Sequence, residues 1–207
     1  IQGSKYIANR ALLLAGLCEG KSIISNIPDN EDIRVLIKTL KNIGVNVKKL
    51  DGLKRIEITR NIKKRRKINV GESGTLLRFM IAISSVLEGE TIINASKRNK
   101  ERPISNLLNS LNDLGVNISK EYPLKVYGGL NGGKTEIDGS ISSQFVSALL
   151  IVAPYAKKEV IIKVKKPIVS EDYINMTINV MKKFGVKVNR EKKKDYEIFK
   201  IKKSKYS

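Results

Sequence analysis

Three short polar clusters could do chemistry, because they combine glycines with serine hydroxyls, amides, lysine and arginine. They are Gly3-Ser4-Lys5-Tyr6 with Asn9 and Arg10, Gly71-Glu72-Ser73-Gly74-Thr75 with Arg78, and Gly139-Ser140-Ile141-Ser142-Ser143-Gln144. Each cluster lies directly before an apolar segment, where a helix N-terminus offers unpaired N–H groups and the positive end of its macrodipole. Lys5, Arg10 and Arg78 add full charges, and the serine pair adds hydroxyl donors suited to phosphate oxygens. Brought together, three such helix ends predict an anion-binding site.

Simpler structural roles compete with this interpretation. Ser142 and Ser143 could be ordinary helix N-caps. Arg10 and Arg78 could be solvated charges, although both adjoin or lie inside apolar runs. Arg102, in the cluster Lys100-Glu101-Arg102-Pro103, could be a simple first-turn charge on the following helix.

The composition excludes several classes of function. The 207 residues contain no histidine, which rules out Ser-His-Asp hydrolysis, His-ligated zinc and His-phosphate chemistry. The single cysteine, Cys18, allows neither an internal disulfide nor a cysteine cluster, so we expect a reducing, cytoplasmic location. No apolar stretch approaches the roughly 20 residues that span a bilayer. The chain starts with Ile1 and shows no signal pattern, so we expect it to begin partway through a longer protein.

The chain has a net charge of +20, but with 41% hydrophobic residues it is too apolar to be a disordered basic tail. The composition therefore predicts a soluble folded protein. A pattern that recurs about every 70 residues organises it: an amphipathic run ends in Gly-Val and an alternating strand, at Gly44, Gly115 and Gly185. The apolar spacing predicts helices over 33–43, 104–114 and 174–184, each with a glycine C-cap. Helix starts are indicated by Asp29 and Asn30, by Pro103 in a first turn, and by Ser170 as an N-cap.

Each repeat also has a more apolar helix, which we expect to be buried. These helices are Ala11–Cys18, Leu76–Leu87 and Phe145–Ala153. Predicted strands follow at Lys21–Asn26, Glu90–Asn94 and Glu159–Val164, with further strands at Arg55–Thr59, Leu124–Tyr127 and Tyr196–Ile201. The lysine-rich stretch Lys63–Lys67 is interpreted as a solvated loop.

The predicted fold class is α/β, with helices inside and sheets outside. Three repeats, at about 1–70, 71–138 and 139–207, are expected to pack around a pseudo-threefold axis as one domain. Two or three independent small domains are the alternative, which the absence of a Pro/Gly/Ser-rich linker disfavours.

Taken together, the motifs closely resemble the 5-enolpyruvylshikimate-3-phosphate synthase family, the 3-phosphoshikimate 1-carboxyvinyltransferases of aromatic amino acid (chorismate) biosynthesis by the shikimate pathway. The matching motifs, in the family's order, are Gly3-Ser-Lys5, Asn9-Arg-Ala-Leu-Leu-Leu14, Ser73-Gly-Thr75 with Arg78, Glu101-Arg-Pro-Ile104, Gly139-Ser-x-Ser-Ser-Gln-Phe145, and Val169-Ser170 with Tyr173-Ile174. The resemblance covers nearly the whole chain. The sequence departs from the family pattern at Tyr6, at Glu72 and at Glu171-Asp172.

The resemblance implies a protein of two similar halves, each of three βαβαββ units, with the active site in the cleft between them. This chain is similar to the half that follows a short N-terminal strand. The other half, which supplies the acid/base carboxylates, a lysine and further arginines, is expected to be missing, so that this fragment alone would be inactive. The implied reaction adds the 5-hydroxyl of shikimate 3-phosphate to protonated phosphoenolpyruvate and then loses phosphate, without a metal or organic cofactor.

The resemblance also implies roles for individual residues. Shikimate 3-phosphate would be bound by Lys5, Tyr6, Arg10, Ser142, Ser143, Gln144, Ser170 and Tyr173. Within this set Arg10 would hold the shikimate carboxylate, the three serines would hold the 3-phosphate, and Tyr173 would pack on the ring. Phosphoenolpyruvate would face Lys5, Gly74, Arg102 and Gln144. Lys5 and Gln144 would be the catalytic residues that this half contributes.

Two other functions remain open at this point. The related enolpyruvyl transferase that uses UDP-N-acetylglucosamine would share the fold and chemistry, but the Glu101–Ile104 and Ser142–Phe145 motifs favour the shikimate enzyme. A basic βαβαββ domain that binds RNA would fit the sequence pI of about 10.0. The similar RNA 3'-phosphate cyclases need a catalytic histidine, and the chain has no aromatic interleaving for base stacking.

Overall fold

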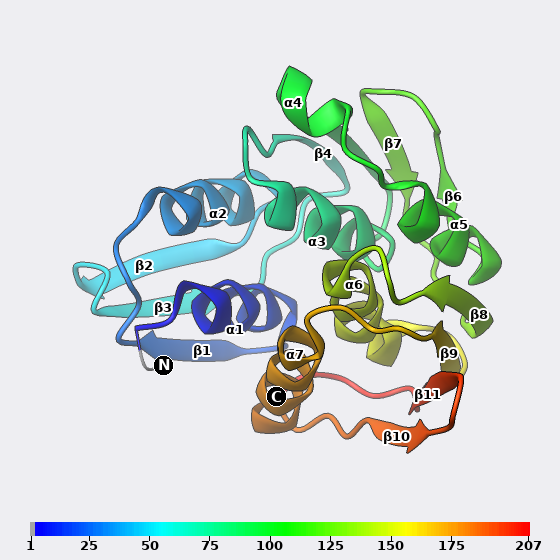
Figure 1. Ribbon diagram of the computed structural model, residues 1–207. Coiled ribbons are helices and arrows are strands. Elements are labelled where there is room, and N and C mark those ends of the chain that lie inside the picture. The colour runs from blue at the N-terminus through cyan, green and yellow to red at the C-terminus, as the bar shows by residue number, and fades with distance from the viewer. Residues whose placement is uncertain (1–2) are drawn as a thin grey trace.

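Three β-sheets, each with its own set of helices, make up the computed structural model, which describes residues 3–207 (Figure 1). Ile1, from which we expect the chain to begin partway through a longer protein, lies outside the described residues, as does Gln2. The first sheet has the strand order β1-β3-β2 and is antiparallel throughout. The second and third have four strands each, in the orders β4-β5-β7-β6 and β10-β11-β9-β8. In these two sheets the first strand along the chain pairs in parallel with the next, β4 with β5 and β8 with β9.

The three blocks of secondary structure follow one another along the chain. The first contains α1 (Lys5–Leu17), β1 (Lys21–Ser25), α2 (Glu31–Asn42), β2 (Asn46–Asp51) and β3 (Arg55–Thr59). The second contains β4 (Arg65–Asn69), α3 (Gly74–Ser84), β5 (Glu90–Asn94), α4 (Lys97–Lys100), α5 (Ser105–Asp113), β6 (Asn117–Ile118) and β7 (Leu124–Tyr127). The third contains β8 (Gly133–Asp138), α6 (Ser143–Val152), the 3-10 turn η1 (Ala153–Tyr155), β9 (Val160–Lys165), α7 (Glu171–Lys183), β10 (Asn189–Lys192) and β11 (Tyr196–Ile201).

The three apolar helices form the interior, as the sequence predicts. Almost every residue of α1, α3 and α6 is buried, and α3 packs on α6 while α1 and α6 both pack on α7. The strands of the sheets alternate between buried and more exposed residues, because successive side chains of a strand point to opposite faces. Ile56 and Ile58 of β3, for example, are fully buried. The sheets therefore cover the helices with one face and leave the other face more open.

The amphipathic helices end as predicted, at three glycines in the left-handed region. Gly44, Gly115 and Gly185 have φ angles of 102°, 86° and 82°, which a residue with a side chain rarely adopts. At the start of α2, the Asn30 side chain accepts a hydrogen bond from the Ile33 N–H at 3.1 Å, which confirms the predicted cap. No helix in the described part of the chain is long and apolar enough to cross a membrane.

Two predicted helix starts are wrong in detail. Helix α5 begins at Ser105 with Ile104 at its N-cap position, so Pro103 lies before the helix rather than in its first turn. Ser170 occupies the N-cap position of α7, but its side chain makes no capping hydrogen bond, and its backbone is left-handed with φ 52°. The hydroxyl of Ser170 is therefore not used by the helix that it precedes.

Three strand predictions also need correction. Within the lysine-rich stretch predicted as a solvated loop, residues 65–67 begin strand β4, and the Arg66 side chain is buried and bonds to Thr91, Leu87 and Glu88. Strand β8 was not predicted from the sequence. Strand β10 begins at Asn189, later than the alternating strand predicted to follow Gly185. Strands β4 and β8 belong to the second and third sheets, so the first strands of these sheets begin at Arg65 and at Gly133.

Candidate anion-binding site

A pocket of about 360 Å³ lies where α1, α6 and α7 begin. Its walls come from these three helix starts and the segments before them, with Asp32 from α2 and Thr75 from α3. The lining residues are Lys5, Tyr6, Asn9, Arg10, Asp32, Thr75, Ile141, Ser142, Ser143, Gln144, Val169, Ser170 and Tyr173. All eight residues predicted to bind shikimate 3-phosphate are among them. The chain thus brings together residues that lie up to about 170 positions apart in sequence.

Arg10 forms the floor of the pocket and is 1% exposed. Its guanidinium donates to Thr177 Oγ1 at 2.6 Å, to the Tyr6 carbonyl at 3.0 Å and to the Tyr173 carbonyl at 3.4 Å. No carboxylate of the described residues pairs with it, and burial lowers its pKa to about 10. A charge held in the interior by neutral partners alone is costly, and an anion in the pocket would offset that cost.

Because Arg10 stands at the mouth of the apolar run Ala11–Cys18, the sequence predicts a guanidinium that reaches the cleft and a side chain that could be removed without disturbing the buried face. The structure corrects this prediction, because the side chain is part of the interior, packed on Phe79 and Tyr173 at 5.3 and 5.8 Å from their ring centroids. A structural ion pair with Glu72 or Asp32 would be the alternative role of Arg10, but Arg10 pairs with no carboxylate of the described residues, and Asp32 pairs with Lys5.

The three serines present hydroxyl groups to the pocket in different ways. Ser142 accepts a hydrogen bond from the Gln144 N–H at 3.2 Å, so the capping role that we considered for it is real. A capping hydroxyl accepts through its oxygen and keeps its own O–H as a donor. Ser143 is the first residue of α6 and is buried, and Ser170 is exposed with its hydroxyl free of any capping bond. All three serines line the pocket.

Tyr6 and Tyr173 form the aromatic wall of the pocket. Their ring centroids lie 5.0 Å apart at an interplanar angle of 65°, an edge-to-face arrangement. A side-chain hydrogen bond with Tyr6 raises the pKa of the Tyr173 phenol, so the Tyr173 hydroxyl remains protonated at neutral pH. The Tyr173 ring also lies beside the buried guanidinium of Arg10, 5.8 Å from its central carbon.

Lys5 supplies a second positive charge at the pocket mouth. Its ammonium lies 3.1 Å from Asp32 Oδ2, and this carboxylate raises the pKa of Lys5 above its usual value. Lys5 therefore stays charged at neutral pH and is unsuited to act as a base. Asp32 is a pocket residue that our sequence analysis did not predict, and its position in the first turn of α2 was the available signal.

A polar chain leads from the pocket to a second cationic region. Gln144 donates through Nε2 to Thr75 Oγ1 at 3.0 Å and accepts from Arg78 Nη1 at 2.9 Å. Arg78 also donates to the Gly74 carbonyl, while its buried Nε has no hydrogen-bond partner in the described structure. Burial and the neighbouring Arg102 both lower the pKa of Arg78.

Arg102 and Gly74, predicted to face phosphoenolpyruvate, lie beyond Gln144 rather than in the pocket itself. A Cβ atom on Gly74 would overlap Arg102 Nη1 and would lie 3.0 Å from Arg78 Nη1. Two guanidinium groups thus converge on the start of α3, whose N-terminal N–H groups favour anions. Glu72 is exposed and lies outside the pocket lining. Gln144 is the residue that connects the two regions.

Comparison with known proteins gives one consistent result. A family model described as EPSP synthase (3-phosphoshikimate 1-carboxyvinyltransferase) matches residues 1–205. The 3-phosphoshikimate 1-carboxyvinyltransferase of Buchnera aphidicola subsp. Cinara cedri (strain Cc) is 43% identical over 213 residues, and that of Salmonella paratyphi B is 40% identical over 198 residues. The alignments cover 98% and 91% of this chain but 48% and 46% of the relatives.

A similar fold occurs in a solved structure. The EPSP synthase from Acinetobacter baumannii superposes with a TM-score of 0.80 at 18% sequence identity. The match covers 100% of this chain and 47% of that structure. The chain therefore spans about half the length of the proteins that it matches.

Proposed function

Because the chain belongs to the EPSP synthase family, we propose that it forms the shikimate 3-phosphate half of a 3-phosphoshikimate 1-carboxyvinyltransferase. The observation that carries this proposal is the convergence of three serine hydroxyls and a buried arginine without a carboxylate partner on one pocket. These groups complement a ligand with a phosphate at one end and a carboxylate at the other.

In the proposed complex, the phosphate lies against Ser142, Ser143 and Ser170. The ring packs on Tyr173 and Tyr6, and the carboxylate points to Arg10 and Lys5. Because the hydroxyl of Ser170 is not engaged in capping, it can donate to a phosphate oxygen without loss of a helix contact. Salt bridges and hydrogen bonds to charged groups are the strong polar contacts in such sites.

Phosphoenolpyruvate would occupy the adjacent region formed by Lys5, Gly74, Arg102 and Gln144. The unneutralised pair Arg78 and Arg102 supports this assignment, since two close guanidinium groups repel each other until an anion lies between them. In the reaction, Lys5 and Gln144 would hold the two substrates and stabilise developing charge. The raised pKa of Lys5 keeps it protonated, so we assign the base of the reaction to the second half of the enzyme.

The proposal includes a partner, the second half of the same enzyme, which would close over the pocket and supply the acid/base groups. It also includes the pseudo-threefold packing of the three repeats and a cytoplasmic location, which the free, buried Cys18 supports. No observation in the structure favours UDP-N-acetylglucosamine or RNA as the ligand.

We expect the isolated 207-residue chain to show no measurable turnover of shikimate 3-phosphate and phosphoenolpyruvate. The reason is that general acid and base catalysis contributes factors of about 10² to 10⁴ for each group, and the proposal assigns these groups to the second half of the enzyme. The release of inorganic phosphate in the presence of both substrates, followed over hours, measures the turnover. Turnover at a typical enzyme rate would contradict the division of labour between two halves.

Binding provides the direct test of the proposed function. Shikimate 3-phosphate should bind the chain at least tenfold more tightly than shikimate, because the phosphate gains charge-assisted hydrogen bonds worth about 1.5–3 kcal/mol each. Isothermal titration calorimetry with both ligands, at the same ionic strength, measures the ratio. Equal affinities for the two ligands would overturn the assignment of the serines to the phosphate.

A further inference from the structure

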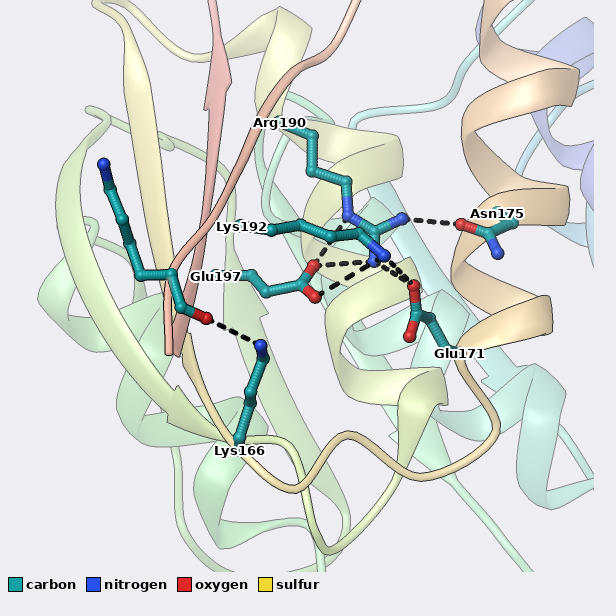
Figure 2. Close-up of polar contacts among 7 residues, drawn as sticks. Lys166, Glu171, Asn175, Arg190, Lys192 and Glu197 are labelled. Atoms are coloured by element: carbon teal, nitrogen blue, oxygen red, sulfur yellow. Dashed lines mark hydrogen bonds and ion pairs between the residues drawn. The ribbon is translucent and has the colours of Figure 1, made fainter. Parts of the chain in front are cut away.

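A cluster of charged residues lies behind the pocket, between the hairpin β10–β11 and the start of α7. Figure 2 shows Arg190 of β10 at its centre, facing Glu197 of β11 on one side and Glu171 and Asn175 of α7 on the other. The Arg190 guanidinium lies 2.6 Å from Glu197 Oε2, 2.6 Å from Asn175 Oδ1 and 2.5 Å from Glu171 Oε1. Lys192 adds a second contact to Glu171 at 2.7 Å. We call these five residues the Arg190 cluster.

The planar guanidinium of Arg190 makes this cluster a rigid connection between the hairpin and α7. One planar guanidinium engages a strand and two positions of a helix at once, which a lysine ammonium could not do with the same geometry. The Glu197 side chain is 2% exposed and that of Arg190 is 16% exposed, so the contacts are screened little by solvent. Lys192 and Arg190 both lower the pKa of Glu171, which keeps this carboxylate charged.

A second connection fixes the chain just before α7. The Lys166 ammonium donates to the Lys193 carbonyl at 2.6 Å (Figure 2). The Lys166 backbone N–H donates to the Asp195 carbonyl at 3.0 Å. Further along, the Val169 N–H donates to the Gly139 carbonyl at 3.0 Å. The segment 166–170 is therefore tied to the hairpin at Lys166 and, at Val169, to the loop that precedes the paired serines.

Ser170 lies between these two connections, next to Glu171. It has a left-handed backbone, which costs a non-glycine residue energy unless its surroundings impose it. It also lines the pocket, while Glu171 and Arg190 do not. The cluster is thus placed to determine where the Ser170 hydroxyl points without touching a ligand itself.

We propose that the Arg190 cluster is a positioning device for Ser170, through which the hairpin β10–β11 sets the affinity of the pocket for a phosphate group. This inference rests on the proposed function, and it assigns a role to residues outside the pocket. It predicts that loosening the connection weakens phosphate binding specifically, rather than the binding of every ligand.

The Glu171→Gln variant tests the proposal because simple electrostatics predicts the opposite change in the affinity for an anion. Removing a negative charge near an anion site should strengthen anion binding, whereas loss of positioning should weaken it. Arg190 keeps its pair with Glu197 in this variant, so no buried carboxylate is left without a partner. Asp172→Asn is the matched control, since it removes a neighbouring first-turn charge that makes no ion pair with the described residues. Asn175→Ala is a second test variant, which loosens the same connection without changing any charge.

Calorimetry with shikimate 3-phosphate and with shikimate measures the affinity ratio for each variant. We expect the ratio to fall about three- to tenfold in Glu171→Gln and in Asn175→Ala, because one well-aligned hydrogen bond to the phosphate is weakened. Asp172→Asn should leave the ratio unchanged or raise it. If the cluster has a purely structural role, the two variants will lower the melting temperature and leave the affinity ratio as in the unchanged chain. That result would overturn the proposal. If the unchanged chain itself fails to prefer shikimate 3-phosphate, the proposed function has failed rather than this inference.

Discussion

Replacing Arg10 with alanine is expected to weaken shikimate 3-phosphate binding by tenfold to hundredfold and to destabilise the fold by about 2–4 kcal/mol. Both effects follow from the same geometry. The guanidinium is the buried charge at the floor of the pocket, and it also bonds Thr177 and two carbonyl groups of α1 and α7. Its loss removes the partner for a ligand carboxylate and leaves a cavity in the interior.

Arg66→Ala is the matched control for this experiment. Arg66 is also an almost fully buried arginine, 3% exposed, and it bonds Thr91 and the carbonyls of Lys63, Leu87 and Glu88. It lies in β4, outside the pocket lining. We therefore expect Arg66→Ala to lose comparable stability with an unchanged affinity.

The two variants are compared by urea denaturation and by calorimetry under conditions where both remain folded. We expect only Arg10→Ala to change the dissociation constant for shikimate 3-phosphate. If both variants lose stability and neither loses affinity, Arg10 is a structural residue, and the carboxylate of the ligand has been placed wrongly.

The Gly74→Ala variant is expected to weaken phosphoenolpyruvate binding by tenfold or more while the stability of the fold is retained. Gly74 is the first residue of α3, where alanine suits the helix as well as glycine or better. Its Cβ would overlap the Arg102 guanidinium, which must then move away from the start of the helix. The end of a flexible side chain moves at little cost in folding, but a charge-assisted hydrogen bond to an anion is lost.

This prediction is measured by NMR, which detects weak binding through the Nε–H resonances of Arg78 and Arg102. Phosphoenolpyruvate is titrated into the chain after saturation with shikimate 3-phosphate. Gly16→Ala is the control, since Gly16 is also helical and its Cβ would meet only the side chains of Leu40 and Val45. A phosphoenolpyruvate dissociation constant for Gly74→Ala equal to that of the unchanged chain would remove Arg102 from the proposed phosphoenolpyruvate site.

Much of the fold could be predicted because its helices carry strong periodic signals. The Gly-Val endings at Gly44, Gly115 and Gly185 and the continuous apolar helices are local features, and they were placed within a few residues. Strands β4 and β8 were missed because their pairing is decided by a distant partner. In β4 the run Lys63–Lys67 is dominated by charge, and nothing local shows that Arg66 finds acceptors across the sheet.

The candidate site shows the same division between local and long-range information. Motif matches identified eight of the thirteen residues that line the pocket, because these motifs lie at the starts of helices. They could not show that the Arg10 side chain is enclosed, since its acceptor Thr177 lies 167 residues away. Nor could they reveal the connection from Arg190 to Glu171, which joins a strand to a helix through side chains alone.

A crystal structure of the chain with shikimate 3-phosphate would test the central claim most directly. The account predicts the ligand in the pocket at the starts of α1, α6 and α7, with its phosphate within hydrogen-bond distance of the hydroxyls of Ser142, Ser143 and Ser170. Its carboxylate should face Arg10 and its ring should lie against Tyr173. A ligand bound elsewhere, for example on the basic segment 60–67, or bound with phosphate and carboxylate exchanged, would contradict the account.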